Sequence, residues 1–258
     1  MPSIDLNADL GESGTRPGLE RETCILDYVS SANIACGGHA GDPYSMSLMI
    51  RACKVKGVVV GAHPAYPDRA NFGRRSMHPG ADITAADLRV TLVRQIHTLI
   101  DMARDQDMDV AYVKPHGALY NDAVKNRELA DLLVGTVKAV NPALLFMGAP
   151  KSEMTWAAER HVLKFIPEGF IDRRYTDEGH LVPRSRAGAV LGTVEGRMGQ
   201  LADILERSCV MTDSGRALKL DVATLCLHGD SDGALATAAR ARKVIKQAGY
   251  QIRSFIHG

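Results

Sequence analysis

Short runs of apolar residues alternate along the chain with segments whose apolar residues recur at helical spacing. The short runs predict strands at Ile4–Leu10, Ser31–Cys36, Val58–Val60, Val110–Val113, Ala143–Met147, Val162–Ile166 and Leu225–Leu227. The helical spacing predicts helices at Pro43–Gly57, Ala85–Arg104, Arg127–Val140, Met154–Arg160, Val194–Glu206 and Ala234–Gln247. A polar loop follows nearly every predicted strand, so the order strand, loop, helix recurs about seven times.

This alternation predicts an α/β protein with a parallel sheet covered by helices. No Ser-, Gly- or Pro-rich linker and no internal repeat divides the chain, so we expect residues 1–258 to form a single domain. A closed barrel is favoured over an open sheet. An open doubly wound sheet concentrates its site where the strand order reverses, whereas a barrel uses the whole rim formed by the C-terminal ends of its strands.

The segment VKPHGALYN, residues 113–121, places a cation and an imidazole directly after a strand. Pro115 cannot donate to a sheet ladder and therefore ends the strand, and Gly117 allows the backbone to turn. Lys114 and His116 thus lie at the edge where α/β proteins place their chemistry. The alternative is an ordinary polar loop with a structural histidine.

Four histidines, each following a different predicted strand, share this placement: His39, His63, His116 and His228. Two interpretations stay open. In the first, His39 and His63 act with Asp9 as ligands of a divalent metal that activates water. In the second, the histidines are general acids and bases, for which an ordinary pKa near 6.5 is suited. No closely spaced histidine pair supports the metal interpretation.

Carboxylates and arginines add to this predicted rim. Asp5, Asn7 and Asp9 alternate and so face one side of their strand, either toward the site or as a polar plug in the barrel. The adjacent pairs Arg74–Arg75 and Arg173–Arg174 follow strands and are suited to binding a carboxylate or phosphate, although solvated surface charge is the alternative. Further polar residues at predicted strand ends are Glu12, Asn33, Asp42, Tyr120, Asn121, Glu168, Asp172, Arg184, Asp230 and Asp232.

Composition narrows the function classes. The net charge of +1 gives no reason to expect nucleic acid as a partner, and no apolar run is long enough to span a membrane. No GxxxxGK[ST] motif occurs, which excludes a P-loop, although backbone amides in the glycine-containing segment 228–234 could hold an anion. Five scattered cysteines and the absence of a secretion signal indicate a cytoplasmic protein. Cys36 is expected to be a buried residue rather than a nucleophile.

Six segments together resemble the LamB/YcsF family of 5-oxoprolinase A subunits. They are IDLNADLGES (4–13), SANIACGGHAGDP (31–43), GAHPAYPDRANFGRR (61–75), VKPHGALYN (113–121), EGFIDRRYTDEGHLVPRS (168–185) and LHGD (227–230). They span nearly the whole chain in the family's order. The departures are Ala8, where many members have cysteine, Ile171, where alanine is common, and the loop after Gly14, which differs from the family's acidic version.

The resemblance implies a (β/α)7 TIM-like barrel of the glycoside hydrolase/deacetylase type. It also implies ATP-dependent hydrolysis of the lactam of 5-oxoproline (pyroglutamate) to L-glutamate, together with separate subunits B and C. The missing P-loop suggests that these partner subunits bind the ATP. A small carboxylate substrate fits the arginines. Whether the chain also forms a homo-oligomer stays open.

Taken together, these observations give a set of candidate residues. The catalytic candidates are Asp9, His39, His63, Lys114 and His116, with Asp9, His39 and His63 as the metal alternative. The substrate-binding candidates are Asn7, Asn33, Asp42, Arg74, Arg75, Tyr120, Asn121, Glu168, Arg173, Arg184 and His228. One competing function is a stand-alone metal-dependent amide or polysaccharide deacetylase on the same barrel. Another is a non-enzymatic ligand-binding subunit, which the density of titratable groups disfavours.

Overall fold

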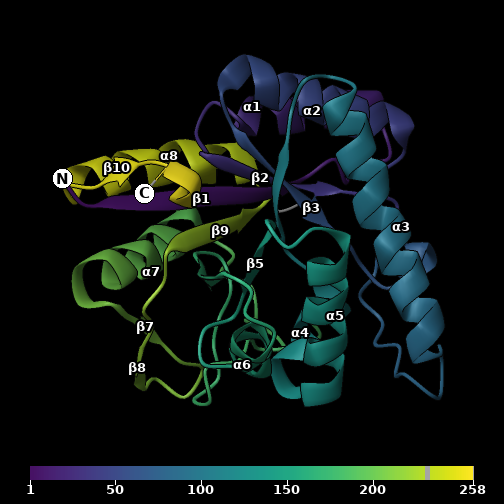
Figure 1. Ribbon diagram of the computed structural model, residues 1–258. Helices are drawn as coiled ribbons and strands as arrows, with labels where there is room; N and C mark the ends of the chain where they lie inside the picture. Colours follow the sequence, from purple (N-terminus) through teal and green to yellow (C-terminus); the bar gives the residue numbers. More distant parts are fainter. Residues whose placement is uncertain (230–232, 258) are drawn as a thin grey trace.

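Seven parallel strands form a closed barrel in the computed structural model, which describes residues 1–229 and 233–257 (Figure 1). Each strand pairs with the next along the chain, and the last pairs with the first, with Asp9 beside His228. The barrel strands are β1 (Ser3–Leu10), β2 (Ser31–Ala35), β3 (Val59–His63), β4 (Val110–Val113), β5 (Leu145–Gly148), β6 (Phe165–Phe170) and β9 (Thr224–His228). The predicted barrel is confirmed.

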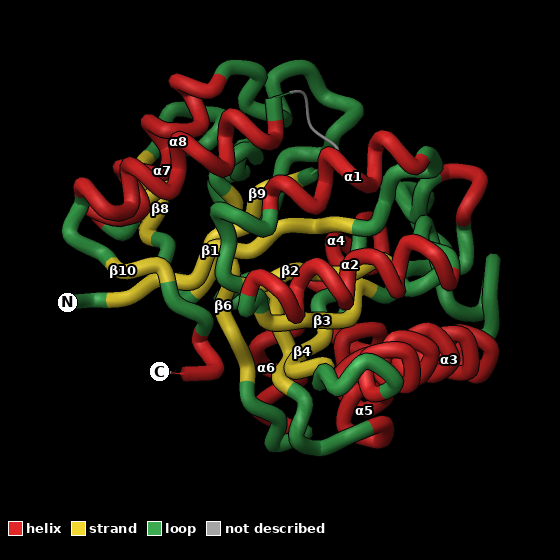
Figure 2. Tube along the Cα trace, turned by 90° about the horizontal axis from the view of Figure 1, so that it is seen from above, coloured by secondary structure: helices red, strands yellow, loops and turns green. Residues whose placement is uncertain are grey.

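Helices pack around the outside of this barrel (Figure 2). They are α1 (Arg16–Ile25), α2 (Pro43–Lys56), α3 (Ala85–Arg104), α4 (Gly117–Lys125), α5 (Arg127–Val140), α6 (Glu153–Arg160), α7 (Val194–Arg207) and α8 (Ala234–Gln247), with short 3-10 turns at η1 (Arg69–Asn71) and η2 (Phe255–His257). The apolar stripe of α3 is buried, as its spacing predicts. Among the described residues, no helix combines the length and the hydrophobicity that crossing a bilayer requires.

Several elements differ from the prediction. Helix α1 was not expected, because its buried face includes Gly18 and Glu22 and its apolar period is weak. Helix α4 was expected as a loop, because Pro115 and Gly117 end the strand without showing that a helix starts at once. Strand β6 begins and ends later than predicted. The hairpin of β7 (Cys209–Met211) and β8 (Ala217–Lys219) was not predicted.

An apolar layer closes the N-terminal end of the barrel. Tyr112, Met147 and Ile166 pack together there, and Phe255 of η2 meets the Tyr112 ring edge to face at 5.2 Å between centroids. Strand β10 (Gln251–Ile252) pairs with the start of β1 and so brings this C-terminal segment beneath the barrel. The chemistry of the barrel is therefore confined to its opposite end.

Gly61 in β3 makes room for the Tyr112 ring inside the barrel. A Cβ atom at this position would lie 2.2 Å from ring atoms of Tyr112, a distance that a rigid aromatic ring cannot relieve by rotating away. Tyr112 also donates a hydrogen bond from its hydroxyl to Asn33 Oδ1 at 2.6 Å, which fixes the ring in place. The glycine is therefore required by packing.

We expect Gly61→Ala to lower the free energy of unfolding by about 1–3 kcal/mol, the usual cost of overpacking a core. Urea unfolding followed by circular dichroism measures the change. Gly199→Ala is the control, because Gly199 lies in α7 with open space around its Cβ position. That variant should be as stable as the wild type or more stable. Equal midpoints for Gly61→Ala and wild type would contradict the packing argument.

Candidate functional site

A cavity of about 680 Å³ opens at the C-terminal ends of the barrel strands. Its volume lies within the range of about 300–1,000 Å³ that is usual for small-molecule sites. Segments far apart in the sequence supply its wall. The deeper lining residues are Asp9, Glu12, His63, Lys114, His116, Tyr120, Glu168, Phe170 and His228, and the arginines of the wall are Arg74, Arg173 and Arg184.

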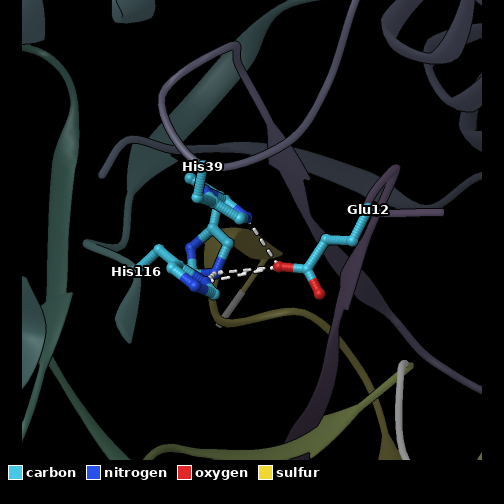
Figure 3. A group of neighbouring side chains, drawn as sticks. Glu12, His39 and His116 are labelled. Carbon is cyan, nitrogen blue, oxygen red and sulfur yellow. Dashed lines mark hydrogen bonds and ion pairs between the residues drawn. The ribbon is translucent and has the colours of Figure 1, made fainter. Parts of the chain in front are cut away.

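Glu12, His63 and His116 line one side of this cavity, and His39 lies behind them; we call these four residues the histidine cluster. Glu12 Oε1 lies 2.8 Å from His39 Nε2 and 3.3 Å from His116 Nδ1, as Figure 3 shows. The rings of His39 and His116 stack in parallel with centroids 3.5 Å apart. One ligand atom from each of the four side chains lies within 4.8 Å of the others, so the group could hold a metal ion.

Backbone carbonyls determine which nitrogens of this cluster carry hydrogen. His63 Nδ1 lies 2.7 Å from the carbonyl oxygen of Lys114, and His116 Nε2 lies 3.0 Å from that of Phe72. A carbonyl oxygen only accepts, so both nitrogens are donors. In neutral rings, the lone pairs of His63 Nε2 and His116 Nδ1 then face each other across 3.0 Å. This arrangement repels unless a proton or a cation lies between them.

Burial keeps the His39 and His116 imidazoles of the histidine cluster neutral. Burial and the neighbouring His116 ring lower the pKa of His39 to about 4, and burial also lowers the pKa of His116. For Glu12, burial opposes ionisation, but the adjacent His116 and His39 side chains outweigh it, and its pKa lies well below the usual range. Neutral imidazoles around a carboxylate are the protonation state in which such side chains bind metal ions.

The loop between β3 and α3 packs directly over the stacked rings of His39 and His116, which we call the histidine pair. Gly73 in this loop has φ +61, and a Cβ there would lie 2.8 Å from His39 Cβ and 3.0 Å from His116 Cδ2. The carbonyl oxygen of Gly73 also accepts the N–H of Ala118 at 2.9 Å, which joins this loop to α4. The histidine cluster is thus covered on this side by backbone.

Lys114 lies at the centre of the barrel's polar interior. Its Nζ is 2.7 Å from Asp9 Oδ1, 2.9 Å from Glu168 Oε1 and 3.0 Å from Cys226 Sγ. Burial opposes its charge, but the nearby Asp9 and Glu168 outweigh burial, and the pKa of Lys114 is raised well above its usual value. Burial raises the pKa of the Cys226 thiol, which leaves it protonated. The charge of Lys114 is therefore already compensated by two carboxylates.

Two asparagines support these carboxylates from below. Asn33 donates from Nδ2 to both Asn7 Oδ1 and Asp9 Oδ1, each at 2.7 Å. Asn7 donates to Glu168 Oε1 at 3.3 Å and to the Thr224 hydroxyl at 2.7 Å. Both asparagines are fully buried and lie beneath the cavity. They hold the residues of the cavity wall in place.

Asp172 and His228 form a dyad on the other side of the cavity. Asp172 Oδ2 and Oδ1 lie 2.8 and 3.0 Å from His228 Nδ1, and Oδ2 also accepts the backbone N–H of His228 at 3.3 Å. Burial opposes the charge of Asp172, but His228 outweighs it, and the pKa of Asp172 is lowered. The Phe170 ring stacks on His228 with centroids 5.6 Å apart. His228 Nε2 therefore faces the cavity, 3.9 Å from Asp9 Oδ2 and beyond hydrogen-bonding distance.

Some of the predicted arginines line the cavity and others lie outside it. Arg173 is buried, its Nη2 donates to the carbonyl of Val182 at 2.7 Å, and burial together with nearby Arg184 lowers its pKa to about 10. Arg74 and Arg184 also line the cavity. Arg75 lies outside it, exposed and paired with Asp82 at 3.1 Å.

The remaining predicted site residues also differ in whether they line the cavity. Tyr120 and Asn121 line the cavity, whereas Asp42 lies outside it and accepts the N–H of Ser45 as the N-cap of α2.

The three predicted metal ligands fall into two groups of side chains. His39 and His63 belong to the histidine cluster, but Asp9 lies in a second group with Cys226 and His228. Asp230, Asp232 and the central part of the predicted anion-binding segment 228–234 lie outside the described residues.

Two residues of this site were placed at the rim by the sequence but given no role. Glu12 lies three residues after Asp9, so the loop that ends β1 carries it toward the histidines. Asp172 follows β6, but its partner His228 is 56 residues further along the chain. Spacing could have suggested Glu12, whereas nothing in the local sequence pairs Asp172 with His228.

Glu22 of α1 holds the loop that carries Glu12. Its carboxylate accepts the backbone N–H groups of Gly11 at 2.5 Å, Glu12 at 3.2 Å and Ser13 at 2.8 Å. Three donors on one carboxylate fix the path of this loop. The unpredicted helix α1 thereby contributes to the site without reaching it.

Fold and site together define a (β/α) barrel with histidines and carboxylates gathered at its C-terminal rim. The sequence profile of the LamB/YcsF family matches residues 4–257, and the chain belongs to this family. It is 40% identical over 255 residues to a 5-oxoprolinase A subunit of Agrobacterium fabrum, covering 99% of this chain and 98% of that protein.

Two further proteins are similar over nearly the whole chain. The 5-oxoprolinase A subunit of Mycolicibacterium gilvum is 40% identical, over 99% of this chain and 100% of its own length. The crystal structure of a lactam utilization protein from Thermus thermophilus superposes with a TM-score of 0.87 at 33% identity, over 98% of this chain and 100% of that one. The expected family and barrel are confirmed.

We expect Glu22→Ala to lower the free energy of unfolding by about 2 kcal/mol, because it leaves buried N–H donors without an acceptor. Urea unfolding checks this value. Glu20→Ala is the matched control on the same helix, because Glu20 is exposed and should change stability little. If the two variants unfold at the same midpoint, Glu22 does not anchor the loop.

Proposed function

We propose that this chain is a component of an ATP-dependent 5-oxoprolinase, which hydrolyses the lactam of 5-oxoproline to L-glutamate. The observation that carries the proposal is one cavity that combines buried arginine with two sets of groups able to handle water and protons. Relatives named as 5-oxoprolinase A subunits, 40% identical over nearly the whole chain, support it. The five cysteines are all unpaired, which agrees with a cytoplasmic location.

The stability of the substrate explains why ATP and other subunits are needed. A five-membered lactam is an unreactive amide, and phosphorylation of its carbonyl oxygen would activate it. The sequence contains no P-loop, so we assign ATP binding to partner subunits B and C. The present chain then takes the activated lactam. Since Lys114 is compensated by Asp9 and Glu168, the arginines of the wall bind the substrate's negative charge.

The histidine cluster fits a divalent metal ion. Burial holds His39 and His116 neutral, the His63 and His116 nitrogens that do not bond a carbonyl face one space, and the Glu12 carboxylate borders that space. Carboxylates also outnumber cations in the deep part of the site, which favours an added positive charge. We propose that Glu12, His39, His63 and His116 hold the ion. When bound, such an ion lowers the pKa of water and polarises a carbonyl.

His228 is the residue we assign to proton transfer. Asp172 holds its Nδ1, so Nε2 can take a proton from the attacking water and return it to the lactam nitrogen when the ring opens. Opening of the phosphorylated lactam leaves an acyl phosphate, which a second water hydrolyses to glutamate and inorganic phosphate. Asp172 stabilises the imidazolium that forms in between. This differs from a role for His63 or His116 in delivering water, because both ring nitrogens of each are engaged within the site.

We expect His228→Asn to reduce glutamate formation about 10²–10⁴-fold, the usual contribution of a general acid or base. The assay mixes this chain with subunits B and C, ATP and 5-oxoproline, and measures glutamate. Asp172→Asn should reduce the rate as well. His97→Gln is the matched control, because His97 is exposed on α3. Wild-type rates in His228→Asn would remove His228 from the mechanism, and no glutamate with the wild-type chain would refute the proposed function.

We expect the wild-type chain, after treatment with a chelator and dialysis, to bind one equivalent of Zn²⁺ or Mn²⁺ in calorimetry and elemental analysis. Bound metal should also raise the melting temperature, because it binds only the folded state. Glu12→Gln and His116→Ala should abolish this binding, and Glu206→Gln, at an exposed carboxylate, should retain it. Failure of the wild type to bind either ion would refute the metal assignment. A bound ion with ATP-independent amide hydrolysis would instead support the deacetylase alternative.

A further inference from the structure

Two arginines of the cavity wall, Arg173 and Arg184, lack an ion-pair partner among the described residues. Arg173 is only 4% exposed, and Arg184 is half-buried. Buried charges are nearly always paired, because taking a charge out of water is costly. The two guanidinium groups therefore indicate that an anion from outside the chain supplies their partner.

Nearby arginines outside the cavity do have carboxylate partners. Arg75 lies 3.1 Å from Asp82, and Arg186 lies 3.4 Å from Asp213. Arg186 follows Arg184 by two residues in the loop between β6 and α7, so this loop is within reach of carboxylates. The arginine of this loop that lines the cavity is unpaired among the described residues, and the one outside the cavity is paired.

Two segments that run side by side bring the two arginines together. Tyr175 pairs with Leu181 in an antiparallel bridge. Arg173 Nη2 donates to the carbonyl oxygen of Val182 at 2.7 Å, two residues before Arg184. Their charges are close enough that burial and Arg184 together lower the pKa of Arg173 to about 10. The fold therefore holds two cations near each other against their mutual repulsion.

Both arginines adjoin the dyad of Asp172 and His228. Arg173 follows Asp172 directly in the chain. Burial opposes the charge of Asp172, but His228 and, to a smaller extent, Arg184 lower its pKa. Since His228 is the residue assigned to proton transfer, an anion bound by the two arginines lies near the group that acts on the reacting carbon.

We infer that Arg184 and Arg173 bind the phosphoryl group of the activated lactam, an inference that rests on the proposed function. Arg184, which makes no hydrogen bond to a described residue, donates to the phosphoryl oxygens. The buried charge of Arg173 adds electrostatic attraction, which is stronger in a desolvated site than in water. After hydrolysis the same two arginines hold the inorganic phosphate.

Charge and position favour the phosphoryl group over the substrate's carboxylate as the partner of these arginines. A phosphoryl group carries up to two negative charges, which match two guanidinium groups, whereas the carboxylate carries one. The phosphoryl group is also bonded to an oxygen of the carbon that water attacks, and the carboxylate is attached to a different ring atom. The anion beside His228 is therefore the phosphoryl group.

The first test measures binding of inorganic phosphate and of acetate to the full chain by calorimetry, at equal ionic strength and without added metal. Wild type should bind phosphate about tenfold or more tightly than acetate, because a dianion attracts both cations. Arg184→Gln should weaken phosphate binding about tenfold or more, the usual effect of losing a charge-assisted hydrogen bond. Arg186→Gln removes the same charge from the same loop outside the cavity and should bind as wild type.

Thermal unfolding separates phosphate binding from a structural role of Arg184. Because Arg173 and Arg184 repel each other, Arg184→Gln without phosphate should melt at the same temperature as the wild type or higher. Added phosphate should raise the melting temperature of the wild type but not of this variant. A lower melting temperature of Arg184→Gln without phosphate would indicate a structural arginine and overturn the inference.

The remaining outcomes are also decisive. Failure of the wild type to bind phosphate overturns the inference, and so does an equal loss of binding in Arg184→Gln and Arg186→Gln, which indicates general charge attraction. ATP should bind no more tightly than inorganic tripolyphosphate, and tighter binding of ATP would instead assign the site to a nucleotide. Phosphate binding uses this chain alone, whereas glutamate formation with subunits B and C decides the proposed function separately.

Discussion

The ion pairs of Lys114 with Asp9 and Glu168 are the interaction on which the rest of the site depends. The three side chains come from β1, β6 and the end of β4, so their contacts cross the inside of the barrel rather than joining neighbouring strands. A buried lysine and buried carboxylates are each costly alone, and removing one partner of such a set costs several kcal/mol. Asn7 and Asn33 donate from below to the same Glu168 and Asp9 oxygens that Lys114 contacts.

Asp9 connects the two halves of the site. Its Oδ1 is held by Lys114 and Asn33, and its Oδ2 lies 3.3 Å from His63 Nε2 on one side and 3.9 Å from His228 Nε2 on the other. Burial opposes its charge, but His63 and Lys114 outweigh burial and lower its pKa well below the usual range. Asp9 thus lies between the histidine cluster and the dyad.

The barrel and most of its strands could be predicted, because a parallel strand that is buried on both faces has an apolar sequence bounded by Gly and Pro. The direction in which each polar side chain points could not be predicted from the sequence. Arg74 and Arg75 are adjacent, yet of the two only Arg74 lines the cavity. The hydrogens of His63 and His116 are fixed by carbonyls that only the tertiary fold brings near.

The loop between β3 and α3 limits the access of solvent to the histidine cluster. Gly73 lets this backbone approach His39 and His116 so closely that no side chain fits between them. His39 and His63 are each 1% exposed, and Glu12, His63 and His116 border the cavity. The histidine cluster therefore meets solvent through the cavity. An ion held by the cluster as proposed would therefore enter before the substrate and leave only after the product.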